Sequence, residues 1–215
     1  MLLGVPECVA VSAWLGQWRL GAVALGDAAN AIESITETLT VDGLAWWGLL
    51  GQLSASDTRV APALPMPGDP CGVPLPGVTQ AVALTRTALL TFDDAGWHQV
   101  DCAHTVPMHS LGEAQRALAL ATTRAEEALS ALPTIGSRSA ADADLAALSA
   151  APLPPSMPAR GQHALETAVR VTVAVNAALR DSTVPSSPSH DDRRIAILLD
   201  LRRAARDLML ASVTQ

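Results

Sequence analysis

LPMPGDPCGVPLPG, the sequence of residues 64–77, decides what kind of structure this chain can form around its centre. Each proline fixes its own φ and removes an amide donor, and each glycine admits backbone conformations that other residues avoid. The stretch therefore cannot form a helix, and it can join a sheet only at an edge. We expect a rigid, irregular loop around one carboxylate, that of Asp69, because rigid loops are where proteins present functional groups.

The sequence on either side of this loop predicts a small, mostly antiparallel sheet. Residues 59–64 read as a short strand, restricted to a sheet edge or a strand start by its proline. Residues 80–92 and 97–102 read as the two arms of a β-hairpin, because they flank the turn tetrapeptide at 93–96. Short apolar runs are ambiguous, so a helix over residues 79–90 is the alternative.

Helices are predicted before the sheet. Residues 9–37 contain Trp14 and Trp18 four positions apart, which places both on one helix face. Glycines weaken a continuous helix by about 1 kcal/mol each, so we expect a break near Gly21 or Gly26. A second apolar helix, again with tryptophans, is expected to follow shortly afterwards.

Three further helices are predicted after the sheet. Ser110 and Glu113 have the spacing of a capping box, and apolar residues at helical spacing follow until Pro133. Residues 160–181 and the segment from Ser189 onward are expected to pack as an antiparallel helical hairpin. The sequence thus predicts an α+β fold that ends in a helical hairpin or three-helix bundle.

The length of 215 residues favours a single domain. Within it we distinguish a mixed α/β part over residues 1–107, which holds the proline loop, and a helical part over residues 108–215. Residues 134–158 are rich in serine, alanine, aspartate and proline, and they predict a flexible connection with room for a short helix.

Composition excludes some classes of partner. The net charge is −7 and all fourteen basic residues are arginine, so binding nucleic acid by neutralising phosphates is disfavoured. Three cysteines without a C-x-x-C pair fit a reducing compartment. We find neither a secretory signal nor an apolar run long enough for a membrane span, and we expect a cytoplasmic protein. The sequence does not indicate the oligomeric state.

No catalytic or metal-binding signature is present. The chain has no phosphate-binding glycine loop, no nucleophile elbow and no pair of histidines at zinc-helix spacing. We therefore predict no catalytic residue, no metal and no cofactor. Asp69 is the strongest candidate for a functional carboxylate, because neighbouring prolines and glycines hold it in place and a fixed carboxylate can act as a base or bind a cation. The simpler reading is an Asx-turn, in which Asp69 accepts an amide of its own loop.

The leading hypothesis is a non-enzymatic, cytoplasmic protein-interaction or scaffold protein that displays the loop to an unidentified protein partner. The alternative is a small-molecule-binding protein or hydrolase-like enzyme centred on Asp69, with His98 or His104 brought near by the hairpin. The candidate ligand-binding or partner-binding residues belong to the loop and to the last helix: Pro67, Gly68, Asp69, Pro70, Gly72, Arg202 and Arg203.

The chain also resembles a family of hypothetical proteins from GC-rich Gram-positive bacteria. The resemblance lies in the L-P-x-P-G-D-P-x-G motif that begins at Leu64, in Ala13-Trp14 of the first helix, and in the Arg-Arg-Ala-Ala sequence at 202–205. The chain departs from it at Val73, where the relatives tend to have leucine, and at Cys71, where they often have arginine. This family has no known activity, so the resemblance implies only an architecture and an important loop.

Overall fold

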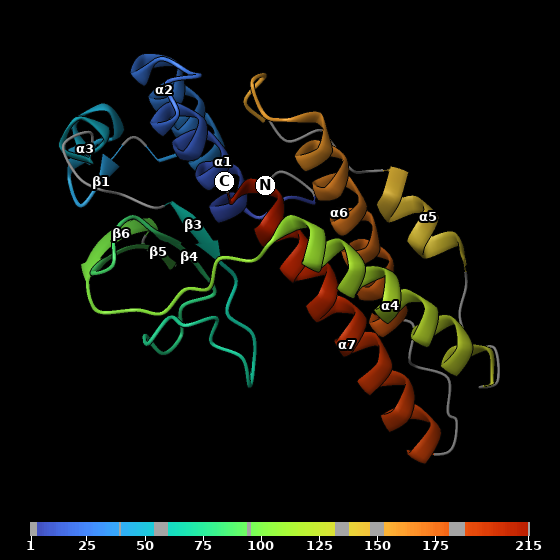
Figure 1. The fold of residues 1–215 in the computed structure, drawn as a ribbon. Coiled ribbons are helices and arrows are strands. Elements are labelled where there is room, and N and C mark those ends of the chain that lie inside the picture. Colours follow the sequence, from blue (N-terminus) through green and yellow to red (C-terminus); the bar gives the residue numbers. More distant parts are fainter. Residues whose placement is uncertain are drawn as a thin grey trace.

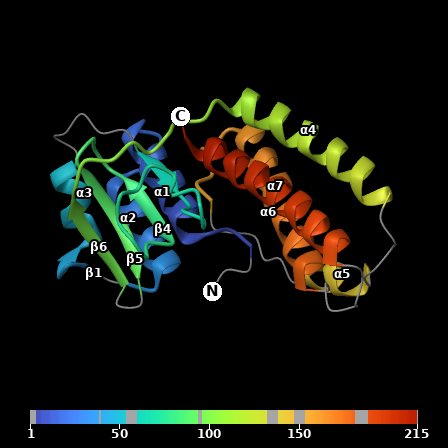
Figure 2. The same cartoon turned by 90° about the horizontal axis from the view of Figure 1, so that it is seen from below.

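A computed structural model describes residues 4–38, 40–53, 60–93, 96–131, 138–146, 153–180 and 188–214. It confirms the α+β class (Figure 1). Helices and antiparallel strands make up the N-terminal half of the chain, and the C-terminal half is helical. Seen from below, the sheet with its covering helices lies beside the C-terminal helices (Figure 2).

The main sheet has four antiparallel strands in the order β3-β4-β5-β6. These strands are β3 (Ala61–Ala63), β4 (Gln80–Ala83), β5 (Ala88–Asp93) and β6 (Gly96–Asp101). The predicted hairpin is confirmed as β5 and β6, which pair from Ala88↔Asp101 to Asp93↔Gly96. Pro62 lies in β3, at the sheet edge where a residue without an amide donor is tolerated.

Residues 80–92 contain the two strands β4 and β5 rather than a helix, and the interpretation of the whole range as one arm of a hairpin was wrong. The chain reverses between β4 and β5, where the amides of Leu84 and Thr85 both donate to the carbonyl of Ala88. The Thr85 hydroxyl also accepts the amide of Thr87, at 3.1 Å. A threonine side chain thus closes a turn in a segment without glycine or proline, which is why the apolar pattern concealed it.

The N-terminal helices cover the sheet. They are α1 (Glu7–Arg19), α2 (Leu25–Thr36) and α3 (Trp46–Leu53), with the short strands β1 (Thr40–Val41) and β2 (Leu44–Ala45) before α3. The predicted break is confirmed by the gap between α1 and α2. Trp46 is fully buried and meets Trp97 edge to face, with 6.3 Å between ring centroids.

The C-terminal helices are α4 (Leu111–Ser130), α5 (Arg138–Ala146), α6 (Ala159–Arg180) and α7 (Pro188–Val213). α7 packs against both α4 and α6, and α6 with α7 forms the predicted antiparallel hairpin (Figure 1). Ser110 is the N-cap of α4, but its side chain makes no capping hydrogen bond. α5 supplies a short helix inside the predicted connection, of which residues 134–137 and 147–152 lie outside the described part.

The end of α7 joins the two halves of the molecule. It packs against α1 and β3, and its buried residues continue the core of the N-terminal half. Among the residues that the structure describes, no helix is long and apolar enough to span a lipid bilayer. The packing of α7 brings one of its faces next to the loop of residues 64–77.

Candidate functional site

The loop of residues 64–77 is built from two tight turns, the first of which has Pro67 and Gly68 at its tip. The amide of Met66 donates to the carbonyl of Asp69, and the amide of Asp69 donates to the carbonyl of Met66, both at 2.8 Å. Proline provides the fixed φ of the first tip position, and Gly68 takes the second with φ of 79°. Backbone hydrogen bonds thus hold the tip of the loop in one conformation.

The second turn spans Pro70 to Val73 and depends on the side chain of Asp69. The amide of Val73 donates to the carbonyl of Pro70 at 3.0 Å, with positive φ at both central residues. Asp69 Oδ1 accepts the amide of Cys71 at 3.2 Å, which is an Asx-turn. Cys71 and Val73 point into the core and are buried. One oxygen of the Asp69 carboxylate therefore serves the loop itself.

Gly72 fastens this second turn to the segment that follows β6. The amide of Thr105 donates to the carbonyl of Gly72 at 3.0 Å. A Cβ atom at position 72 would lie only 2.3 Å from the carbonyl oxygen of Thr105. The two backbones approach so closely that only glycine fits there.

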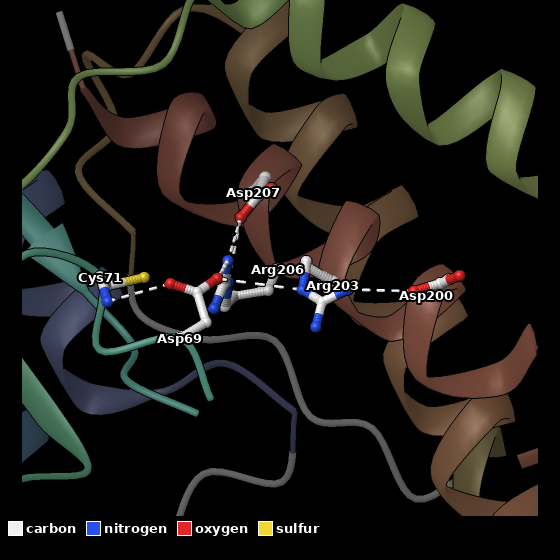
Figure 3. A network of polar contacts seen from close by, with 6 residues as sticks. All are labelled: Asp69, Cys71, Asp200, Arg203, Arg206 and Asp207. Carbon is white, nitrogen blue, oxygen red and sulfur yellow. Dashed lines mark hydrogen bonds and ion pairs between the residues drawn. The ribbon is translucent and has the colours of Figure 1, made fainter. Parts of the chain in front are cut away.

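The other oxygen of Asp69 reaches α7, which docks the loop on the helical part (Figure 3). Arg206 Nη2 lies 2.6 Å from Asp69 Oδ2 and 2.7 Å from Asp207 Oδ1. The side chain of Arg206 is only 7% exposed, so its guanidinium group is shielded from water, whereas the Asp69 side chain is 32% exposed. Arg203 Nε lies 3.9 Å from the same Asp69 oxygen, and Arg203 Nη1 donates to Asp200 at 3.0 Å.

The charges at this contact stabilise one another. Hydrogen bonding from Arg206 lowers the pKa of Asp69 below its ordinary value, against the opposing effect of partial burial. Burial would lower the pKa of Arg206, but its bonds to Asp69 and Asp207 outweigh that effect and raise it. Burial also raises the pKa of the Cys71 thiol. At neutral pH the site therefore holds a carboxylate that is a weak base and a thiol that is a poor nucleophile.

Comparison with known proteins gives two family matches that together cover most of the chain. Residues 8–107 match the family model "Rv1486c-like protein, N-terminal domain", and residues 112–209 match "Rv1486c-like protein, C-terminal domain". The chain belongs to the Rv1486c-like family. No curated protein and no solved structure matches it. The family is mycobacterial, and no activity comes with it.

The two Rv1486c-like family regions meet at the docked loop, since Asp69 lies in the N-terminal region and Arg206 in the C-terminal one. Of the candidate residues, Pro67, Gly68 and Pro70 are exposed. Gly72 packs on Thr105, and Asp69 is bonded to Arg206.

On the helix, Arg203 is exposed and Arg202 is half-buried. The sequence interpretation missed Arg206 and Asp207, which contribute to the contact. A signal for Arg206 was available, because it follows Arg202 by one helical turn and so shares its face.

The two histidines proposed to work with Asp69 in this Rv1486c-like chain, His98 and His104, contact other residues. His98 Nδ1 is 2.8 Å from Asp42 Oδ1, and His98 Nε2 is 3.3 Å from Asp93 Oδ1. His104 Nε2 lies 2.5 Å from the carbonyl oxygen of Thr85. No contact between Asp69 and either histidine is seen in the described ranges, and no group of three metal-ligating side chains is found there.

The contact between His98 and Asp42 gives a testable pH dependence. The hydrogen bond that His98 donates to the Asp42 carboxylate raises the pKa of His98 above 6.5. A raised pKa in the folded state stabilises the fold below pH 6.5, and this contribution is lost as the pH rises through the folded-state pKa. We expect Asp42→Asn to lower the pKa of His98, measured by NMR titration of its ring protons. Asp101→Asn is the control, because Asp101 ends β6, the strand that contains His98. An identical His98 titration in both variants would contradict the contact.

Proposed function

We propose that this chain is a non-enzymatic, cytoplasmic protein-interaction protein whose binding surface combines the tip of loop 64–77 with the neighbouring arginines of α7. The observation that carries the proposal is the ion pair between Asp69 and Arg206. This pair fixes the exposed Pro67 and Gly68 beside the exposed Arg203. A rigid apolar tip next to guanidinium groups loses little conformational entropy when a partner binds.

The same contacts favour binding over catalysis at Asp69. One carboxylate oxygen accepts the Cys71 amide and the other is bonded to Arg206. A general base needs a free lone pair and a pKa near the working pH, whereas this pKa is lowered. The docked Asp69 thus acts as a structural anchor for the surface.

The chemistry of the surface indicates what the partner presents. Arg202 and Arg203 offer planar guanidinium groups, which bind carboxylates in a bidentate manner. The proline-containing tip offers a flat apolar area with no amide donor at its proline positions. We expect the partner to supply an acidic side chain next to apolar ones.

Affinity capture from a native cell extract tests the proposal. We expect the double variant Arg202→Gln/Arg203→Gln to lose the proteins that the wild type retains, because the carboxylate-binding groups are removed. Arg124→Gln changes an exposed arginine on α4 and is the matched control, so it should retain them. Melting temperatures of the variants should equal that of the wild type. Retention of the same proteins by the double variant would refute the proposed surface.

A further inference from the structure

We propose that the protein partner of this surface is a second copy of the same chain, bound through the outer strip of α7 in an antiparallel arrangement. The outer strip consists of Asp192, Ile195, Leu199 and Arg202. This inference rests on the proposed function, because it names the partner of that surface. It is carried by the apolar spacing, the charge order and the position of the docked loop along α7.

Three of the four residues of the outer strip are exposed and Arg202 is half-buried, although the centre of the strip is apolar. Ile195 and Leu199 lie one turn apart, and each residue is 38% exposed. The adjoining side of α7 carries Leu198, Ala205 and Leu208, which are buried against the neighbouring helices. Successive strip residues are separated by three, four and three positions, which is the spacing of the seam of a two-stranded coiled coil.

The order of charges along the strip selects an antiparallel second copy. When two α7 helices cross antiparallel about residue 197, Ile195 faces the partner subunit's Leu199 and Leu199 faces the partner subunit's Ile195. In the same register, Asp192 faces the partner subunit's Arg202. Within the described part of the chain neither Asp192 nor Arg202 has an ion-pair partner of its own. A parallel pair would instead place aspartate against aspartate and arginine against arginine.

The docked loop agrees with this register. Arg206, which binds Asp69 of the loop, lies opposite the partner subunit's Pro188 in this register, and Pro188 is the first residue of α7. The α7 helix of the partner subunit therefore begins at the point where the loop covers α7 of the first subunit. The exposed Pro67 and Gly68 then stand beside the first turn of the partner helix, and this contact adds area to the interface.

The size of the strip predicts a weak, reversible dimer. Because the arrangement is symmetric about residue 197, the contact runs from residue 188 to residue 206 on each helix, which is about 27 Å at about 1.5 Å per residue. Two apolar layers and two ion pairs over this length fall at the small end of specific interfaces, with dissociation constants on the order of tens of micromolar.

Sedimentation equilibrium of the purified full chain, from about 1 µM to about 1 mM, brackets that affinity. We expect the wild type to change from monomer to dimer within this range. Asp192→Arg should leave only monomer, because each new arginine would face the partner subunit's Arg202. Leu199→Ser should weaken association at least tenfold. The charge swap Asp192→Arg/Arg202→Asp should restore the dimer, since it rebuilds both pairs only in the antiparallel register. Leu120→Ser, on the exposed face of α4, is the control and should dimerise like the wild type.

The outcomes separate this inference from the proposed function. A wild type that stays monomeric throughout overturns the second copy as partner, and so does a dimer that Asp192→Arg and Leu199→Ser leave unchanged. If the chain is monomeric but still captures another protein through Arg202 and Arg203, the proposed function stands and this inference fails. If Asp192→Arg abolishes the dimer, Asp192→Arg/Arg202→Asp restores it, and affinity capture retrieves the chain itself, both the inference and the proposed function are supported. Melting temperatures close to that of the wild type show that each variant is folded.

Discussion

Gly72→Ala is expected to lower the free energy of unfolding by about 3 kcal/mol, the largest effect of any single methyl group added to the loop. The φ of Gly72 is 72°, which costs a residue with a side chain about 1–2 kcal/mol. The added Cβ would also lie 2.3 Å from the Thr105 carbonyl oxygen. Backbone cannot rotate away as a flexible side chain can, so the hydrogen bond from Thr105 to Gly72 must lengthen or break.

Gly68→Ala is the matched control for this prediction. Gly68 also has a positive φ, 79°, but no atom lies within 4 Å of the position that its Cβ would take. It should therefore cost only the conformational term, about 1 kcal/mol. Thermal unfolding followed by circular dichroism measures both, with about 2–4 °C expected per kcal/mol for a chain of this size. Equal melting temperatures for the two variants would show that the contact with Thr105 is not close.

The sequence predicted the fold class because the deciding signals are local. The turn tetrapeptide at 93–96 predicted the hairpin, Pro62 predicted the edge strand, and Gly21 predicted the break between the first two helices, where it has a φ of 70°. Each of these effects acts within a few residues. The reversal at 84–87 was missed for the same reason, because its closing group is a threonine hydroxyl rather than a glycine or proline.

The candidate site was only partly predictable. The importance of Asp69 within its loop could be argued from neighbouring prolines and glycines, and the Asx-turn reading is confirmed by the bond to Cys71. Its main partner, Arg206, lies 137 positions later in the chain. Choosing it over Arg202 or Arg203 requires the rotational phase of α7 on the sheet, which tertiary packing alone determines. A local pattern cannot specify that phase.

Docking through Asp69 and Arg206 gives the two family regions one defined arrangement. The N-terminal region supplies the loop, and the C-terminal region supplies the buried guanidinium. Because α7 also packs on α1 and β3, the ion pair adds to an apolar contact that already exists. Apolar packing tolerates small shifts, whereas a hydrogen-bonded ion pair has a required geometry. The pair therefore fixes where the loop tip stands relative to Arg203.

Arg206→Met is expected to lower the free energy of unfolding by about 2 kcal/mol at pH 7. Breaking a fully buried ion pair costs about 3–5 kcal/mol, but Asp69 is 32% exposed and can regain water. The Nη1 atom of Arg206 is buried without an acceptor among the described residues, so its removal also relieves a cost. Methionine keeps most of the apolar length of the side chain, and the loss therefore reports on the charge contacts.

A double-mutant cycle with Asp69→Asn isolates the pair. We expect Asp69→Asn alone to cost about 1 kcal/mol and the double variant to cost about as much as Arg206→Met alone, a coupling of about 1 kcal/mol. The pKa of Asp69 is lowered below 3.8 in the folded state, so its contribution is fully present above that pH and is lost as the pH falls through the folded-state pKa. The difference in melting temperature between wild type and Arg206→Met should accordingly shrink on acidification from pH 7 towards the folded-state pKa. A difference that is constant with pH, or single effects that simply add, would mean that apolar packing alone docks the loop and that Asp69 and Arg206 are neighbours without energetic coupling.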